Sequence, residues 1–249
     1  LDEQSSSERV RAAAEKDGFD ADLWAGLGEL GAFTLRVPEE LGGLGLGVMD
    51  AVVLMEESGR TLASGPVAET LVASRILARL AAEGEAELLE QVMMGTQVLT
   101  LALHDVAEQP LQWVAGGAIA NAVIARKGDQ VILVKLADGE SRGEPTLAST
   151  PIAELQLDVS DAVVLGEGVA AVKTFAEGVE EWKLLLAAAL SGLSRRAVEM
   201  AAEYACEREA FGKPIGTYQA ISHPLADLIT EIDGGKYLTW KAIHDIVKG

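Results

Sequence analysis

Two long helical patterns at the end of the sequence constrain the fold more than any other feature. Apolar residues recur at helical spacing in "VEEWKLLLAAALSGLSRRAVEMAAEYACEREAFG" (179–212) and again in "YQAISHPLADLITEIDGGKYLTWKAIHDIVK" (218–248). Gly212 and Pro214 are placed to end the first helix, and Thr217 is placed to cap the second. Helices this long and this apolar must each bury a face. We therefore expect partner subunits, or chain beyond this sequence, to complete a helical bundle.

The preceding residues divide into a helical part and a β-rich part. Asp20 or Asp22 is placed to cap a helix that carries an apolar stripe from Leu23 to Leu30. In contrast, "AIANAVIARKGDQVILVKL" (118–136) predicts two strands joined by a turn at Gly128 and Asp129. The predicted fold is mostly α with a small β domain. It comprises an N-terminal helical domain (1–97), a central β-rich domain (98–173) and a C-terminal helical domain (174–249).

Composition excludes several classes of partner. The chain has 249 residues and a net charge of −19, so its average field repels nucleic acid. No apolar run approaches the roughly 18 residues that a membrane span requires. The N-terminal "LDEQSSSERV" is unlike a secretory or transit peptide, and the single cysteine, Cys206, excludes an intrachain disulfide. These features favour a cytoplasmic protein, with Cys206 buried as a small hydrophobic residue.

The motifs of metal and nucleotide sites are missing from the sequence. The three histidines, His104, His223 and His244, are far apart and accompany a single cysteine, so no metal site is predicted. The "GGLGLG" stretch (42–47) lacks the strand–turn–helix context of a dinucleotide-binding loop.

Motifs in two distant regions resemble one family. The turn "REAFGKPIGTYQ" (208–219), the early segments "GFDADLWAGLGELG" (18–31) and "VPEELGGLGLGVMDAVVLMEESGR" (37–60), and the order of domains are similar to those of acyl-CoA dehydrogenases. The resemblance implies an FAD-dependent oxidoreductase that converts acyl-CoA thioesters to 2,3-enoyl-CoAs. In that family a carboxylate removes the α-proton, the β-hydrogen leaves as hydride to the flavin, and an electron-transferring flavoprotein is the expected acceptor.

The resemblance also assigns cofactor-binding residues. Arg208 matches the arginine that contacts the FAD pyrophosphate of a neighbouring subunit, Gln219 matches a glutamine that reaches the same FAD, and Phe211 matches the motif's aromatic residue. An arginine fork suits phosphate oxygens, and the start of a helix supplies free N–H donors. The alternative is that Arg208 forms a surface ion pair and that Gln219 is a solvated first-turn residue.

Two departures from the family concern the flavin ring and the catalytic base. The stretch "LALHDVAEQPLQWVAGGA" (101–118) lacks the family's Thr-Glu-Pro and Gly-Ser-Asp segments, so the chain is expected to hold a flavin ring of its own poorly. At the position where a minority of the family carries its base, this chain has Trp182. The following Lys183 matches a residue that approaches CoA. Glu180 and Glu181 are expected to be solvated near the start of their helix, and no catalytic base is identified.

Three functional hypotheses follow. In the first, the chain is a non-catalytic subunit of a heteromeric acyl-CoA dehydrogenase of the kind associated with steroid catabolism, and it contributes to a sister subunit's FAD site. In the second, it is a self-sufficient homo-oligomeric enzyme whose base lies beyond residue 249. In the third, it is a helical scaffold without flavin. The amount of FAD bound per chain distinguishes the first two.

Overall fold

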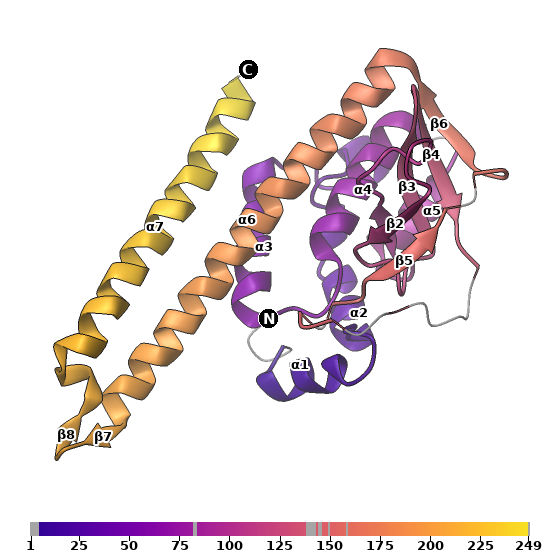
Figure 1. Ribbon diagram of the computed structural model, residues 1–249. Helices are drawn as coiled ribbons and strands as arrows, with labels where there is room; N and C mark the ends of the chain where they lie inside the picture. Colours follow the sequence, from indigo (N-terminus) through magenta and orange to yellow (C-terminus); the bar gives the residue numbers. More distant parts are fainter. Residues whose placement is uncertain are drawn as a thin grey trace.

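The computed structural model places helices on either side of a small β-rich region in chain order (Figure 1). The described residues are 5–81, 84–137, 143, 146–148, 150–157 and 159–248. The predicted fold class, mostly α with a small β domain, is confirmed. The division into three domains at residues 97 and 173 stays a prediction.

Five helices form the N-terminal part: α1 (Ser7–Ala14), α2 (Ala21–Glu29), α3 (Val48–Thr61), α4 (Val67–Ala81) and α5 (Ala86–Met93). Short 3₁₀ turns at Ala32–Thr34 and Glu39–Leu41 lie between α2 and α3. Asp20 is the residue that caps α2, because its side chain accepts the N–H of Leu23 at 3.0 Å. Local capping chemistry in the sequence therefore locates the start of this helix correctly.

The β-rich part holds two sheets. Strands β1 (Leu99–Leu101), β3 (Ala122–Lys127), β4 (Gln130–Lys135) and β6 (Val163–Glu167) pair in the order β1-β3-β4-β6, while β2 (Leu111–Val114) pairs with β5 (Ala153–Gln156). The predicted hairpin is confirmed, since β3 and β4 are antiparallel and pair Lys127 with Gln130 across the turn. Apolar side chains on one face of the larger sheet join the core of the N-terminal helices, and those on the other face pack against β2 and β5.

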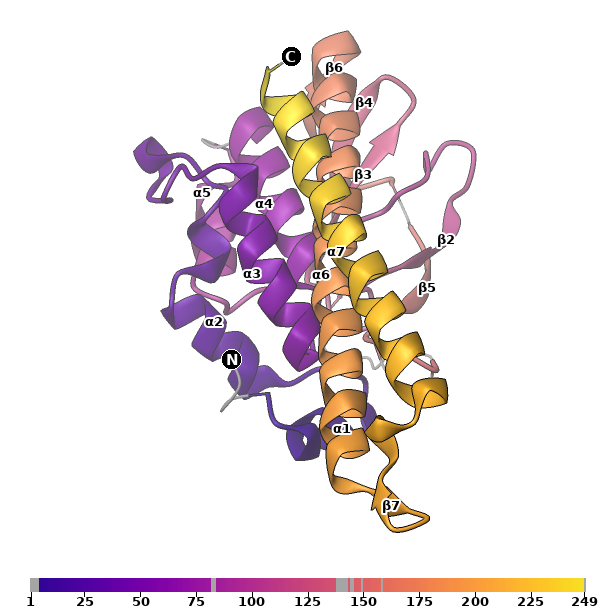
Figure 2. The same ribbon diagram turned by 90° about the vertical axis from the view of Figure 1, so that its left-hand side faces the viewer.

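Two long helices form the C-terminal part, α6 (Gly168–Glu207) and α7 (Gln219–Lys248). Figures 1 and 2 show α7 running back along α6, with the connecting turn at the far tip. The sequence predicted the end of the first helix incorrectly. The helix stops at Glu207, and a small hairpin of β7 (Glu209–Ala210) and β8 (Lys213–Pro214) follows it.

The hairpin explains why Gly212 does not cap α6. Phe211 (φ 53°) and Gly212 (φ 77°) are both left-handed, the geometry of a tight two-residue hairpin turn. Thr217 does not cap α7 either, because its hydroxyl donates to the carbonyl of Pro214 at 2.7 Å and the helix begins at Gln219. The helix continues through Pro224, which therefore does not mark a late start.

Several large apolar side chains remain exposed on α6 and α7, as expected for helices that lack partners. They are Val169, Leu190, Met200, Tyr204, Ile221, Leu228, Tyr237, Leu238, Trp240 and Ile246. Cys206 is also exposed, so the prediction that it is buried was wrong. Its position on the last turn of α6, away from the α3 and α4 contacts, accounts for the difference. Among the described helices, none combines the length and apolar character needed to cross a membrane.

Helices α3 and α6 cross at a pair of glycines. A Cβ on Gly59 would lie 1.9 Å from the carbonyl oxygen of Ala189, and a Cβ on Gly192 would lie 1.9 Å from that of Glu56. Backbone meets backbone at both points, so neither helix has a flexible side chain that could move aside. The close approach requires glycine at both positions.

We predict that Gly192→Ala lowers the free energy of unfolding by about 1–3 kcal/mol, because the added methyl group forces α3 and α6 apart. Urea denaturation followed by circular dichroism measures the change. Gly234→Ala on α7 is the control, since a Cβ there meets nothing within 4 Å. That control should be neutral or stabilising by up to about 1 kcal/mol. Equal effects of the two substitutions would contradict the close crossing.

Candidate functional site

The residues that the resemblance assigns to FAD gather at the tip between α6 and α7. Arg208 is the first residue after α6, and its carbonyl accepts the N–H of Ile215 at 2.8 Å across the hairpin. The hydroxyl of Tyr218, which precedes Gln219, donates to the carbonyl of Ala210 at 2.9 Å. These two bonds hold both ends of the turn together, so Arg208 and Gln219 lie on one small structural unit.

The tip presents free polar and aromatic groups. Arg208 and Gln219 are exposed, and within the described part of the chain neither side chain has a hydrogen-bond or ion-pair partner. The side chain of Phe211 is 97% exposed and meets only the edge of Tyr218, with ring centroids 6.5 Å apart. Because the first N–H groups of α7 have no partners within the helix, the tip also carries backbone donors. This arrangement suits an anionic ligand supplied from outside the chain.

Trp182 and Lys183 lie far from this tip. From Lys183 to Arg208 the chain is helical, and 25 helical positions span roughly 38 Å at about 1.5 Å per residue. Lys183 is exposed and donates to Glu180 at 2.7 Å. The fold therefore does not bring the residue expected to approach CoA together with the residues expected to bind FAD in one chain.

Sequence reasoning missed a buried carboxyl group next to Trp182. The indole N–H of Trp182 donates to Glu69 on α4 at 2.8 Å, and Glu69 is buried. Burial raises the pKa of the Glu69 carboxyl, and the hydrogen bond from Trp182 opposes that shift only in part. The two residues are 113 positions apart in the sequence, so no local pattern marks the pair.

The prediction that Glu181 is solvated was wrong. Its side chain is buried between two arginines: Arg36 donates to both carboxylate oxygens at 2.7 and 3.0 Å, and Arg75 donates to one at 2.5 Å. The helix begins at Gly168, so Glu180 and Glu181 lie well inside it and not in its first turn. Glu180 does remain exposed, as expected. The helix turns Glu181 toward α4, where the arginines neutralise it.

The loop between β1 and β2 satisfies many of its own polar groups. The buried Gln112 side chain accepts the N–H of His104 at 3.0 Å and donates to the carbonyls of His104 and Gln109 at 3.1 and 2.9 Å. The Asp105 carboxylate accepts the N–H groups of Ala107 and Gly128 at 2.9 and 3.0 Å. The polar side chains of Gln112 and Asp105 in this stretch are thus bonded within the chain.

The residues present thus fit part of an FAD molecule. The tip offers a free guanidinium and the free N–H groups of a helix start, which is the donor set that binds phosphate. For metal ions, the described residues hold no group of three or more histidine, cysteine, aspartate or glutamate side chains with a suitable arrangement.

Comparisons with known protein families give matches at both ends of the chain. Residues 3–100 match the family model "Acyl-CoA dehydrogenase, N-terminal domain" and residues 167–249 match "Acyl-CoA dehydrogenase, C-terminal domain". Acyl-CoA dehydrogenase IpdE2 of Mycobacterium tuberculosis is 32% identical over 238 residues, which are 94% of this chain and 69% of that protein.

Two solved structures have the same fold. The Tcur3481-Tcur3483 steroid ACAD G363A variant superposes with a TM-score of 0.84 at 30% identity, over 99% of this chain and 74% of that one. The ChsE4-ChsE5 complex from Mycobacterium tuberculosis superposes with a TM-score of 0.76 at 28% identity, over the same shares of the two chains. This chain thus spans about three quarters of the length of each.

We predict that Glu181→Gln lowers the free energy of unfolding by about 3–5 kcal/mol, because it leaves two largely buried guanidinium groups without their shared carboxylate. Glu177→Gln, one turn earlier on α6, is the control. Its ion pairs are 3.5 and 3.8 Å long and half-exposed, so its loss should cost at most about 1 kcal/mol. Urea denaturation of both variants measures the change in the free energy of unfolding. A decrease for Glu181→Gln as small as that for the control would indicate that Glu181 is solvated.

We predict that Glu69→Gln stabilises the protein at pH 7–8 but has little effect near pH 4. The raised pKa means that the folded state holds the Glu69 proton more tightly than the unfolded state does. Stability is therefore full below the ordinary glutamate pKa and falls as pH rises through the raised value. The amide removes this loss while keeping an acceptor for Trp182. The measurement is thermal unfolding of the Glu69→Gln variant from pH 4 to 8, with Glu57→Gln at an exposed site as the control. A stabilisation by Glu69→Gln that does not vary with pH would contradict the prediction.

Proposed function

This chain belongs to the acyl-CoA dehydrogenase family, an oxidoreductase family whose cofactor is FAD, and from that premise we propose that it acts as one subunit of a hetero-oligomer. In the proposal, the tip formed by Arg208, Phe211 and Gln219 completes the FAD site of a sister subunit. The assembled complex oxidises an acyl-CoA thioester to the 2,3-enoyl-CoA. The distance of roughly 38 Å between this tip and Lys183 carries the proposal, because it is too long for one small site within a single chain.

The tip has specific tasks in this function. Arg208 would grip pyrophosphate oxygens through its guanidinium fork, and the start of α7 would add backbone donors and the positive end of a helix dipole. Gln219, the first residue of α7, would donate through its amide. Phe211, exposed at the turn, would cover apolar surface beside the cofactor. When bound, FAD supplies the acceptor for the hydride that leaves the β-carbon.

Other observations support the role of a partner subunit. Trp182 occupies the position at which a minority of the family carries its base, and its indole is bonded to the buried Glu69. The loop between β1 and β2 engages its polar groups internally. One of the similar structures is a complex of two different chains, ChsE4 and ChsE5, and another is a steroid acyl-CoA dehydrogenase. We therefore infer a steroid-type acyl-CoA substrate and a sister acyl-CoA dehydrogenase chain.

Lys183 has a separate task on α6. It lies exposed beside Glu180, and we propose that its ammonium group approaches the CoA part of the substrate. The cytoplasm as the location, and an electron-transferring flavoprotein as the electron acceptor, are also part of the proposal. The location follows from the N-terminal sequence and the single cysteine, and the electron acceptor follows from the resemblance to the family. The division of the chain into domains 1–97, 98–173 and 174–249 accompanies it.

We predict that the chain expressed alone is colourless, and that co-expression with its sister subunit gives a complex with about half an FAD per chain. Flavin absorbance per mole and mass by light scattering measure both. A yellow homo-oligomer with about one FAD per chain would contradict the proposal in favour of a self-sufficient enzyme.

We predict that Arg208→Ala weakens FAD retention in the assembled complex about tenfold to a hundredfold, because it removes charge-assisted hydrogen bonds to phosphate. Flavin release during dilution, followed by fluorescence, gives the change. Arg196→Ala is the control, since Arg196 lies on the same helix but pairs with Glu199 and Glu203. Unchanged retention in Arg208→Ala would reject the assignment of the tip to FAD.

A further inference from the structure

A second charged site lies away from the tip, between the first half of α6, the start of α3, the end of α4 and the end of α7. The cavity there has a volume of ≈ 760 Å³, within the range of small-molecule sites. One part of its wall is cationic, formed by Arg36, Arg75, Arg79 and Lys173. Another part is apolar and includes Val48, Leu184 and Ile246. A smaller adjoining cavity of ≈ 380 Å³ shares the three arginines.

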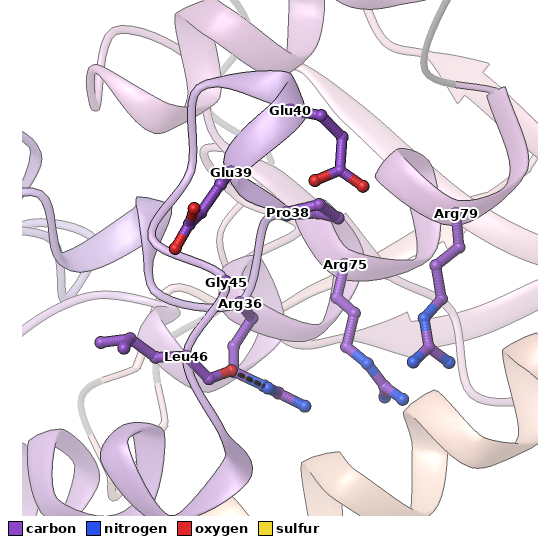
Figure 3. Close-up of a pocket in the computed structure, with 8 residues that line it drawn as sticks. All are labelled: Arg36, Pro38, Glu39, Glu40, Gly45, Leu46, Arg75 and Arg79. Atoms are coloured by element: carbon purple, nitrogen blue, oxygen red, sulfur yellow. Dashed lines mark hydrogen bonds between the residues drawn. The ribbon is translucent and has the colours of Figure 1, made fainter.

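The arginines come from two parts of the chain, α4 and the turn between the 3₁₀ segments that precede α3. Arg75 and Arg79 lie one turn apart on α4, and Figure 3 shows their side chains pointing the same way, toward the region that the Arg36 side chain also reaches. Like charges four residues apart on a helix repel each other. The fold nevertheless places both guanidinium groups at one cavity in a chain whose net charge is −19.

Internal carboxylates neutralise this wall only in part. Glu181 is shared by Arg36 and Arg75, and Glu177 lies 3.5 Å from Arg79 and 3.8 Å from Lys173. Glu180 also lines the cavity but is bonded to Lys183, at 2.7 Å. In the adjoining cavity, Figure 3 shows the Glu39 and Glu40 carboxylates on the side away from the guanidinium groups. The four cationic side chains of this wall are therefore in contact with only two carboxylates among the described residues, those of Glu177 and Glu181.

Arg75 and Arg79 have spare hydrogen-bonding capacity. A guanidinium carries five N–H donors. Within the described residues, the Arg75 side chain bonds only to Glu181, although it is just 12% exposed. Arg79 is 47% exposed, and its single ion pair, with Glu177, is long. The site thus has two neighbouring guanidinium groups with free N–H donors next to an apolar wall. This geometry suits a ligand with a carboxylate group and an apolar body.

We propose that this cavity binds an amphipathic organic carboxylate. Arg79 and Arg75 hold the carboxylate group, and the apolar body lies against Val48, Leu184 and Ile246. The site is distinct from the tip of Arg208 and does not depend on flavin chemistry. Glu181 neutralises Arg36 and one side of Arg75, so the ligand meets Arg79 and the free side of Arg75.

The test is calorimetric titration of the full 249-residue chain with octanoate, hexanoate and octanamide. We expect saturable binding of octanoate and about fifteenfold weaker binding of hexanoate, since hexanoate lacks two CH₂ groups and each buried CH₂ group contributes about a factor of four. Octanamide has the same apolar body without the charge and should bind at least tenfold more weakly than octanoate. Inorganic phosphate probes the charged groups alone and should bind more weakly than octanoate. Equal affinities for octanoate and octanamide, or tighter binding of phosphate than of octanoate, would overturn the proposal.

Substitutions assign the binding to the cavity. Arg79→Gln should weaken octanoate binding at least tenfold, and Arg79→Lys should retain part of the affinity. Arg196→Gln, farther along α6 and outside the lining of the cavity, should leave the affinity for octanoate unchanged. Arg79 is half-exposed with a single long ion pair, so its replacement leaves the fold intact, and thermal unfolding checks this. Octanoate binding that is the same in Arg79→Gln and in Arg196→Gln would place the ligand elsewhere and reject the site.

Discussion

The close crossing of α3 and α6 is the contact on which the rest of the structure depends. Glycines at 59 and 192 let the two backbones meet, which fixes the position and rotation of a helix of 40 residues. With α6 held in this way, Glu181 is turned toward Arg75 of α4 and toward Arg36, and Trp182 reaches Glu69. The end of the same helix lies beyond the N-terminal helices, so Arg208 is at an extended tip of the molecule (Figure 1).

The length of α6 separates two kinds of chemistry. Its middle packs against α4 and satisfies its charges within the chain, through a buried carboxylate shared by two arginines. Its end presents the Arg208 guanidinium, which has no hydrogen-bond or ion-pair partner in the described part of the chain, and the Phe211 ring, which is 97% exposed and meets the edge of Tyr218. Unpaired donors at an exposed tip are inexpensive in water, whereas unpaired charges inside the protein are costly. The exposed donors of the tip are therefore stable without a partner in this chain, whereas Glu181 requires the two arginines that contact it.

Charge is distributed unevenly over the molecule. A net charge of −19 disfavours anionic ligands on average, so any anion must be bound by a local group of cations. Two such groups occur: Arg208 with the start of α7 at the tip, and the arginines of α4 with Arg36 beside the cavity. The first is the group that we propose binds a sister subunit's FAD. The second is formed by residues that the family motifs of this sequence do not include.

The sequence by itself determined the features that depend on neighbouring residues. The helical repeats, the strands on either side of Gly128 and a cap at Asp20 or Asp22 all follow from interactions within a few positions, and the family resemblance rests on such segments. Only the tertiary structure decided that Glu181 is buried, that Cys206 is exposed, and that Glu69 meets Trp182. Glu181 bonds to Arg36 across 145 positions and to Arg75 across 106, and no local pattern records such a pairing. The environment of a side chain depends on which helices pack together, and that packing is set by backbone contacts such as those of the two glycines.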